Sequence, residues 1–119
     1  ELSRLPLLHQ SARPDAWREW FEVAGLNHVN AMGGARYELF SMLVQAAKVG
    51  LGVTLVPRFF VVNEVETGKL VIPCPQVLRS QRGYYLVYPE NKVSSPSLQV
   101  FRRWLLSQAA IYREANPTA

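Results

Sequence analysis

The feature that most constrains this chain is an apolar helix pattern followed by a glycine turn and a buried strand pattern, all within residues 33–57. Most positions in 37–49 are apolar, which predicts a helix covered on several sides. Gly50 and Gly52 end that pattern. The continuous apolar run 53–56 then follows, as is typical of a parallel strand covered on both faces. This pairing of helix and strand indicates a layered α/β fold.

Strand and helix patterns alternate along the whole chain. The strand patterns are 5–9, 27–32, 53–56, 70–72 and 84–88. The helix patterns are 14–24, 37–49, 57–67 and 96–113. The apolar spacing of Trp17, Trp20, Phe21 and Ala24 is that of one helical face, and Gly25 is placed to end this helix. The order predicts an α/β fold with a mainly parallel sheet flanked by helices and right-handed crossovers.

Three loops are expected at the carboxyl ends of the strands, where open α/β sheets bind their ligands. They are 9–11, 32–36 and 56–58. Gly33 and Gly34 are expected at the start of the 37–49 helix, where uncovered N–H groups and the helix dipole attract a small anion. We therefore expect the N–H groups of Gly34 and Ala35 to hold a carboxylate or another polar anion. Gln10, Ser11 and Arg36 are placed to help.

Plainer interpretations of the same residues stay open. The two glycines equally suit a tight turn, which is the commonest task of glycine. Arg36 and Arg58 suit solvated surface positions. His9 at a strand end suits a hydrogen bond to the backbone, and the aromatic face of the 14–24 helix suits a core or a dimer contact.

The sequence shows no catalytic constellation. It contains no nucleophile elbow, no phosphate loop and no dinucleotide-binding glycine motif. Its carboxylates fall mostly on exposed helix faces or helix ends, so no acid–base pair is expected to converge. Cys74 is the single cysteine, and only His9 and His28 could join it as metal ligands. The prediction is a site that holds a ligand unchanged, with no enzyme activity, metal or cofactor.

Composition excludes further classes. A chain of 119 residues that is 49% hydrophobic fits one domain or a piece of one. The net charge of +4 comes without a basic run, so no nucleic-acid footprint is expected in this segment. No stretch approaches the roughly 18 apolar residues of a membrane span, and the first ten residues do not read as a signal peptide. A reducing, cytoplasmic location is expected.

Four blocks of the sequence carry a family resemblance. They are RPDAWREWFEVAGL, GGARYELFSMLVQAAKVGLGVTLVPRFFVVNEVETGKLV, YYLVYPE and SLQVFRRWLLSQ. In this order and spacing the chain resembles LysR-type transcriptional regulators, above all the subgroup typified by the glycine-cleavage activator. The most specific stretch is QAAKVGLGVTLVPRFFV with the later GKLV.

The resemblance implies part of a two-lobed effector-binding domain of the periplasmic-binding-protein type 2 architecture. Residues 1–90 would form the second lobe, including a returning crossover strand at 84–88. Residues 91–119 would form the C-terminal helix that packs on the first lobe. The implied partners are a small-molecule effector and further copies of the chain in a dimer or tetramer. DNA would bind only through a winged helix-turn-helix outside this chain, and no membrane is involved.

The resemblance also implies that the effector lies in the cleft between the lobes. The residues expected to contact it are Met32, Gly33, Gly34, Ala35, Arg36, Tyr37, Val56, Pro57, His9, Gln10 and Ser11. Two other classes share this fold. One is a solute-binding protein of a transport system, which an upstream secretory signal would support. The other is an enzyme lobe that takes its catalytic groups from a second half.

Overall fold

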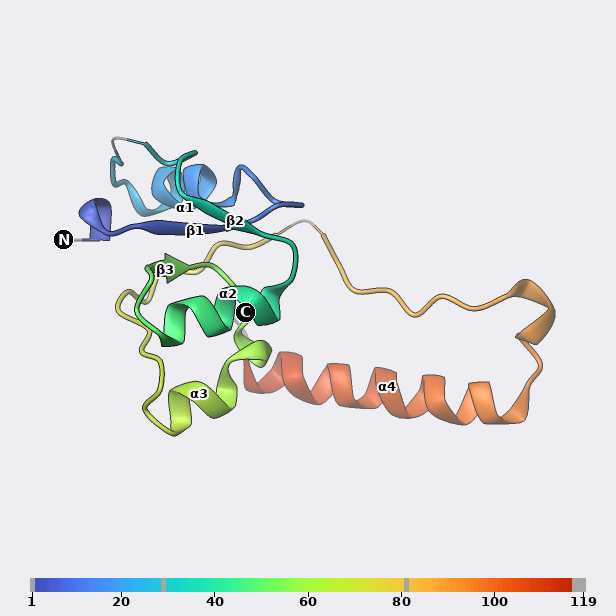
Figure 1. The fold of residues 1–119 in the computed structure, drawn as a ribbon. Helices are drawn as coiled ribbons and strands as arrows, with labels where there is room; N and C mark the ends of the chain where they lie inside the picture. Colours follow the sequence, from blue (N-terminus) through green and yellow to red (C-terminus); the bar gives the residue numbers. More distant parts are fainter. Residues whose placement is uncertain (1, 29, 81, 117–119) are drawn as a thin grey trace. The chain divides into compact units, whose positions relative to one another are not determined.

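The computed structural model describes residues 2–28, 30–80 and 82–116. The chain divides into two units, Glu1–Leu78 and Arg79–Ala119 (Figure 1). Unit 1 holds the sheet and the helices that cover it. Unit 2 holds an extended stretch and a 20-residue helix.

Unit 1 is built on a three-stranded parallel sheet in the order β2-β1-β3. The strands are β1 (Leu7–Gln10), β2 (Ala35–Tyr37) and β3 (Val53–Thr54), and a short 3₁₀ turn, η1 (Leu2–Arg4), precedes them. Strand β1 is central, because Leu8 pairs with Ala35 on one side and with Thr54 on the other. A parallel sheet with helices between its strands confirms the predicted α/β fold class.

Successive residues of β1 point to opposite faces of the sheet and supply two separate cores. Leu7 packs against the aromatic side chains of α1 (Ala16–Ala24). Leu8 packs against Leu43 of α2 (Phe40–Lys48). Figure 1 shows α1 and α2 on opposite sides of the sheet. The central strand is therefore covered on both faces.

Helix α1 forms as its apolar spacing predicts, and Trp17, Trp20 and Phe21 are all buried. The two indole rings meet edge to face with their centroids 5.5 Å apart, a favoured aromatic geometry. Nε1 of Trp17 donates a hydrogen bond to the carbonyl of Leu8 at 3.0 Å, so this buried N–H has an acceptor. Gly25 ends the helix in the left-handed conformation, with φ 67°, as predicted.

Helix α2 begins later than predicted and is covered on fewer sides. Leu39 has an extended backbone, with φ −114° and ψ 144°, so the helix starts at Phe40. Leu43 is fully buried, whereas Met42 is 47% exposed. The expectation of a helix covered on most sides is corrected, because one face of α2 remains open among the described residues.

Three predicted strands differ in the structure. Segment 27–32 forms no strand in its described part but turns, with residue 29 outside the described ranges. The second strand lies after the glycines, at Ala35–Tyr37, and not before them. Segments 70–72 and 84–88 form no strand either. A strand is stable only when it pairs with other strands, and the described sheet contains β2, β1 and β3 but neither of these two segments.

The predicted helix from Pro57 is divided in two. A 3₁₀ turn, η2 (Arg58–Phe60), comes first, and the short helix α3 (Val62–Glu66) follows. Val61 lies between them and is buried, with φ −125°, which is outside the helical region. The non-helical backbone of this buried residue marks the break between η2 and α3.

Unit 2 contains the 3₁₀ turn η3 (Glu90–Lys92) and the helix α4 (Pro96–Ala115). Helix α4 begins at Pro96, directly after Ser95, as predicted. None of its residues is buried. Its exposed large apolar side chains are Val100, Phe101, Trp104, Leu106 and Ile111. Within the described ranges, no helix is both long and apolar enough to cross a membrane.

The core around Leu43 gives a direct stability test. Replacing Leu43 by alanine leaves a cavity beneath Leu8, and we expect the free energy of unfolding to fall by about 2–5 kcal/mol. Met42→Ala is the matched control, since it shortens an exposed neighbour on the same helix and should cost about 0.5 kcal/mol. Urea denaturation followed by tryptophan fluorescence measures both. Equal losses would contradict the packing described for α2.

Candidate functional site

The carboxyl ends of β1 and β2 meet at one edge of the sheet. Gln10 pairs with Tyr37 in the register of these strands. The backbone N–H of Ser11 donates to the carbonyl of Tyr37 at 2.8 Å, and its hydroxyl donates to the same oxygen at 3.3 Å. The side-chain amide of Gln10 donates to the carbonyl of Glu38 at 3.3 Å. Three of the predicted site residues, Gln10, Ser11 and Tyr37, are thus brought together.

The exit from β3 leads toward the same edge. Thr54 pairs with Leu8, and the chain runs on in the direction of β1 through Val56 and Pro57. Val56 packs beside Leu8 in the core under α2. The parallel course of β1 and β3 directs these two predicted residues toward the carboxyl edge, and Val56 contributes there to the core that contains Leu8.

The start of helix α2 lies at this edge, directly after β2. Leu39 occupies the N-cap position and makes no side-chain capping bond. Its carbonyl accepts hydrogen bonds from Met42 and Leu43, but the N–H groups of Phe40 and Ser41 meet no acceptor in the part of the chain that the structure describes. Uncapped N–H groups at a helix start favour an anion. The helix start expected to attract an anion is formed by Phe40 and Ser41, and not by Gly33 and Gly34.

The glycines lie elsewhere than predicted. Gly34 directly precedes β2, and a Cβ built on it would come within 2.1 Å of the carbonyl oxygen of Leu7, the first residue of β1. Met32, Gly33 and Gly34 thus lie at the amino end of the sheet, and Ala35 pairs with Leu8 inside it. The expectation that Gly34 and Ala35 open a helix is wrong. The glycine is needed for close approach of two backbones.

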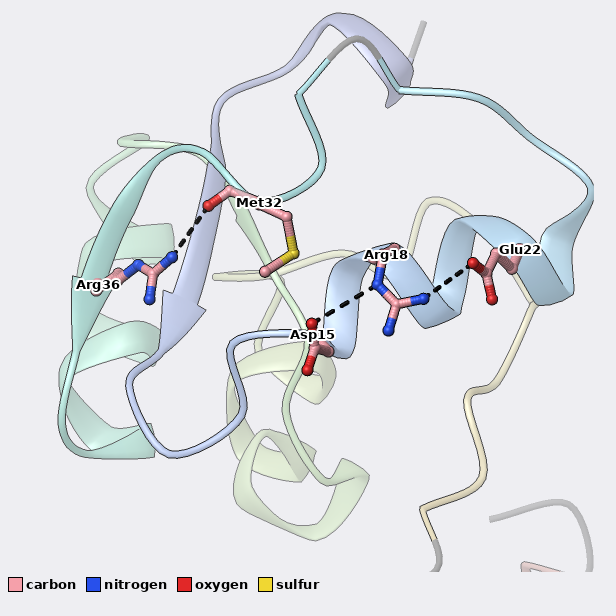
Figure 2. A network of polar contacts seen from close by, with 5 residues as sticks. All are labelled: Asp15, Arg18, Glu22, Met32 and Arg36. Atoms are coloured by element: carbon pink, nitrogen blue, oxygen red, sulfur yellow. Dashed lines mark hydrogen bonds and ion pairs between the residues drawn. The ribbon is translucent and has the colours of Figure 1, made fainter.

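His9 and Arg36 also turn away from the carboxyl edge. His9 is only 2% exposed, and its Nε2 lies 2.7 Å from the carbonyl of Gly33, which makes Nε2 the donor. Arg36 pairs with His9 in the sheet and donates from its guanidinium to the carbonyl of Met32 at 3.2 Å, as Figure 2 shows. The plainer interpretation of His9, a hydrogen bond to the backbone, is confirmed.

Arg13 is a residue of this edge that sequence reasoning did not select. It lies in the loop after β1, and its backbone N–H donates to the carbonyl of Gln10 at 3.0 Å. Its guanidinium carbon lies 5.4 Å from the ring centroid of Phe40, the first residue of α2. The available signal was its position two residues after Ser11. Its partner Phe40 is 27 residues away in sequence, so no local pattern reveals the contact.

Catalytic or metal-binding clusters do not appear at this edge. In the described ranges no group of three or more His, Cys, Asp or Glu side chains could hold a metal ion. A separate ion-pair cluster lies on α1, where Arg18 contacts Glu22 at 3.0 Å and Asp15 at 3.6 Å (Figure 2). The hydrogen bond to Glu22 is the main reason that the pKa of Arg18 is raised. All three side chains are solvated, so this cluster belongs to the helix surface.

One further polar atom is notable. Oε1 of Gln10 is buried and has no hydrogen-bond partner in the described part of the chain. A buried acceptor without a donor costs free energy. The edge therefore combines an unsatisfied acceptor at Gln10 with unsatisfied donors at Phe40 and Ser41.

A parallel-sheet lobe with polar groups and an uncapped helix start at its carboxyl edge is the architecture of a ligand-binding α/β domain. Residues 1–110 match the family described as the LysR substrate binding domain. This chain belongs to that family.

The relatives are transcriptional regulators. The chain is 35% identical over 114 residues to the glycine cleavage system transcriptional activator of Escherichia coli K12, covering 96% of this chain and 37% of that protein. It is 33% identical over 112 residues to the HTH-type transcriptional regulator PerR of the same organism, covering 91% of this chain and 37% of PerR. The chain thus spans well under half the length of these two relatives.

A solved structure shares the fold. The effector domain of the transcriptional regulator AmpR of Pseudomonas aeruginosa superimposes with a TM-score of 0.79 at 22% sequence identity. The match covers 99% of this chain and 56% of that one. The likeness confirms the expected LysR effector-domain architecture, of the periplasmic-binding-protein type 2.

The structural role of Gly34 is open to test. Gly34→Ala forces a Cβ onto the Leu7 carbonyl at a backbone φ of 116°, and we expect it to lower the free energy of unfolding by about 3 kcal/mol or more. Gly68→Ala is the matched control, because Gly68 also has a positive φ, 75°, but open space around it, so a loss of about 1 kcal/mol is expected. Chemical denaturation measures the free energy of unfolding of both variants. A Gly34→Ala variant as stable as Gly68→Ala would show that the close approach does not hold the sheet.

Proposed function

We propose that this chain is the ligand-sensing part of a LysR-type DNA-binding transcriptional regulator, and that it binds a small anionic metabolite without transforming it. The observation that carries the proposal is the carboxyl edge of the sheet. There the uncapped start of α2 meets Gln10, Ser11 and Tyr37, and β3 directs Val56 and Pro57 toward the same edge. A chain of this family with such an edge is suited to holding a metabolite by hydrogen bonds and helix-end charge.

The rest of the pocket comes from a second lobe. The chain corresponds to 56% of the AmpR effector domain, which supports an effector site completed by residues outside this chain. Ligand bound in the cleft stabilises a closed arrangement of the lobes and changes the packing between subunits of a dimer or tetramer. It does so only through a difference in affinity between the two arrangements.

The same proposal defines the partners. DNA binds through a winged helix-turn-helix outside this chain, and the regulator works in the cytoplasm without contact to a membrane. The proposal includes no enzyme activity and no cofactor, which agrees with relatives that are named as regulators. Those names also disfavour the transport alternative, a solute-binding protein.

Unit 2 supplies the connection to the first lobe in this proposal. Residues 1–90 form the second lobe, and segment 84–88, which is not a strand in this structure, becomes the returning strand when it pairs with the first lobe. Within residues 91–119, helix α4 packs on the first lobe. Two observations support these separate roles for the two parts of the chain. Segment 84–88 is apolar at every position, which suits a strand covered on both faces, and no residue of α4 is buried within this chain.

Gln10 tests the proposed site. We expect thermal-shift screening of the full-length regulator against amino acids, small carboxylates and phosphates to identify a ligand that raises the melting temperature. Gln10→Leu keeps the side-chain size but removes the amide, so the ligand-induced shift should fall by at least half. Gln45→Leu is the control, because Gln45 lies on the exposed face of α2. An unchanged ligand-induced shift in Gln10→Leu would remove this edge from the site.

Helix α4 tests the role of unit 2. The exposed apolar side chains of α4 need a cover, so the 119-residue chain expressed alone should self-associate. Light scattering at high concentration should give a mass above that of one chain. The double variant F101S/W104S should lower the measured mass toward that of a monomer. Arg103→Ser, a polar change on the same helix, should leave the mass unchanged. A clean monomer for the unmodified chain would refute the idea.

A further inference from the structure

The guanidinium of Arg13 is held at the start of α2 by an aromatic platform. It lies 5.4 Å from the ring centroid of Phe40. That ring packs against Phe60 with a centroid distance of 5.3 Å, and Phe60 stacks on Phe59 at 4.9 Å. A guanidinium over an aromatic face is attracted by the ring quadrupole. The positive charge thus contacts one ring, Phe40, which itself packs against Phe60.

No carboxylate neutralises this charge within the described residues. The ion pairs found there involve Arg18, which is shared between Asp15 and Glu22. Glu38 lies at the same edge, two residues before α2, but makes no ion pair with Arg13. None of the described hydrogen bonds uses an N–H group of the Arg13 side chain, so its donors remain available.

The surroundings make this position electrostatically unusual. A helix start carries partial positive charge, and cations are stabilised at the opposite end of a helix. The guanidinium of Arg13 nevertheless lies over the ring of Phe40, the first residue of α2. The backbone N–H groups of Phe40 and Ser41 meet no acceptor in the described chain. One formal positive charge and one uncapped helix start thus belong to the same helix turn. An anion that reached both groups would interact favourably with each.

We infer that Arg13 is the residue that recognises the charged group of the effector, and that this group presents two oxygens to its guanidinium, as a carboxylate or a phosphate does. The inference rests on the proposed function and adds a specificity-determining residue to that site. The inference assigns this role to Arg13 and not to Arg36, because the guanidinium of Arg36 donates a hydrogen bond to the carbonyl of Met32.

The test follows the backbone amide signals of Phe40 and Ser41 by nuclear magnetic resonance in the full-length regulator, because the proposed pocket is completed by residues outside this chain. Sodium acetate and inorganic phosphate are titrated separately at constant ionic strength, and acetamide serves as the neutral counterpart of acetate. We expect at least one of the two anions to shift both amides saturably and acetamide to have no effect. Whichever anion acts identifies the source of the two oxygens.

Three variants assign the effect to Arg13. Arg13→Gln should raise the dissociation constant by about tenfold or more, as expected for a lost charged hydrogen-bonding partner. Arg13→Lys keeps the charge but loses the planar fork, so an intermediate value is expected. Arg36→Gln is the matched control and should leave the dissociation constant unchanged. The amide signals of Leu8 and Leu43 report whether each variant keeps the fold, and Arg13→Lys decides the question if Arg13→Gln does not.

The outcomes separate this inference from the proposed function. If neither anion shifts the amides of the unmodified chain, the anion site itself is overturned, and the role of Arg13 with it. If an anion binds but Arg13→Gln binds it equally well, only the role of Arg13 is overturned. If Arg36→Gln weakens binding as much as Arg13→Gln does, the effect is general surface charge, which also overturns the inference.

Discussion

The structure of unit 1 depends on the burial of strand β1 on both of its faces. Leu7 enters the aromatic core of α1, and Leu8 enters the aliphatic core of α2. The same strand pairs with β2 on one side and β3 on the other, so its backbone and its side chains are engaged in every direction. No other element in the described chain is seen to contact all four of α1, α2, β2 and β3. The positions of the loops at the carboxyl edge follow from this one strand.

Parallel pairing on β1 explains why the candidate site lies where it does. Strands that run in one direction bring their carboxyl ends to one edge, so Gln10, Tyr37 and the exit from β3 arrive together. The helix start after β2 then faces the same edge. The amino end of the sheet is built differently, because Gly34 lets the backbone before β2 pass close to the Leu7 carbonyl. The two ends are therefore built differently: the carboxyl end carries the proposed binding site, and the amino end holds two backbones in close contact.

Sequence reasoning succeeded where a local pattern carries the information. The 3.6-residue spacing of Trp17, Trp20 and Phe21 located α1, and Gly25 its end. Sequence reasoning failed where the structure of a segment depends on a contact with residues that are distant in the sequence. The apolar run at 84–88 suits a strand, but a strand forms only by pairing with another strand, and this segment is not part of the described sheet. Likewise Gly34 suits a helix start or a tight turn by its sequence, and only the tertiary structure shows that it lies against the carbonyl of Leu7.

By itself the sequence determined the fold class, the family resemblance and the residues of β1 that end at the carboxyl edge of the sheet. The reason is that apolar periodicity and the order of motifs are properties of neighbouring residues along the chain. Tertiary structure alone decided which predicted residues share that edge. It placed His9 and Arg36 away from it and brought Arg13 over Phe40. The physical reason is that a site is made by distances between residues far apart in sequence, and those distances exist only after the strands have paired.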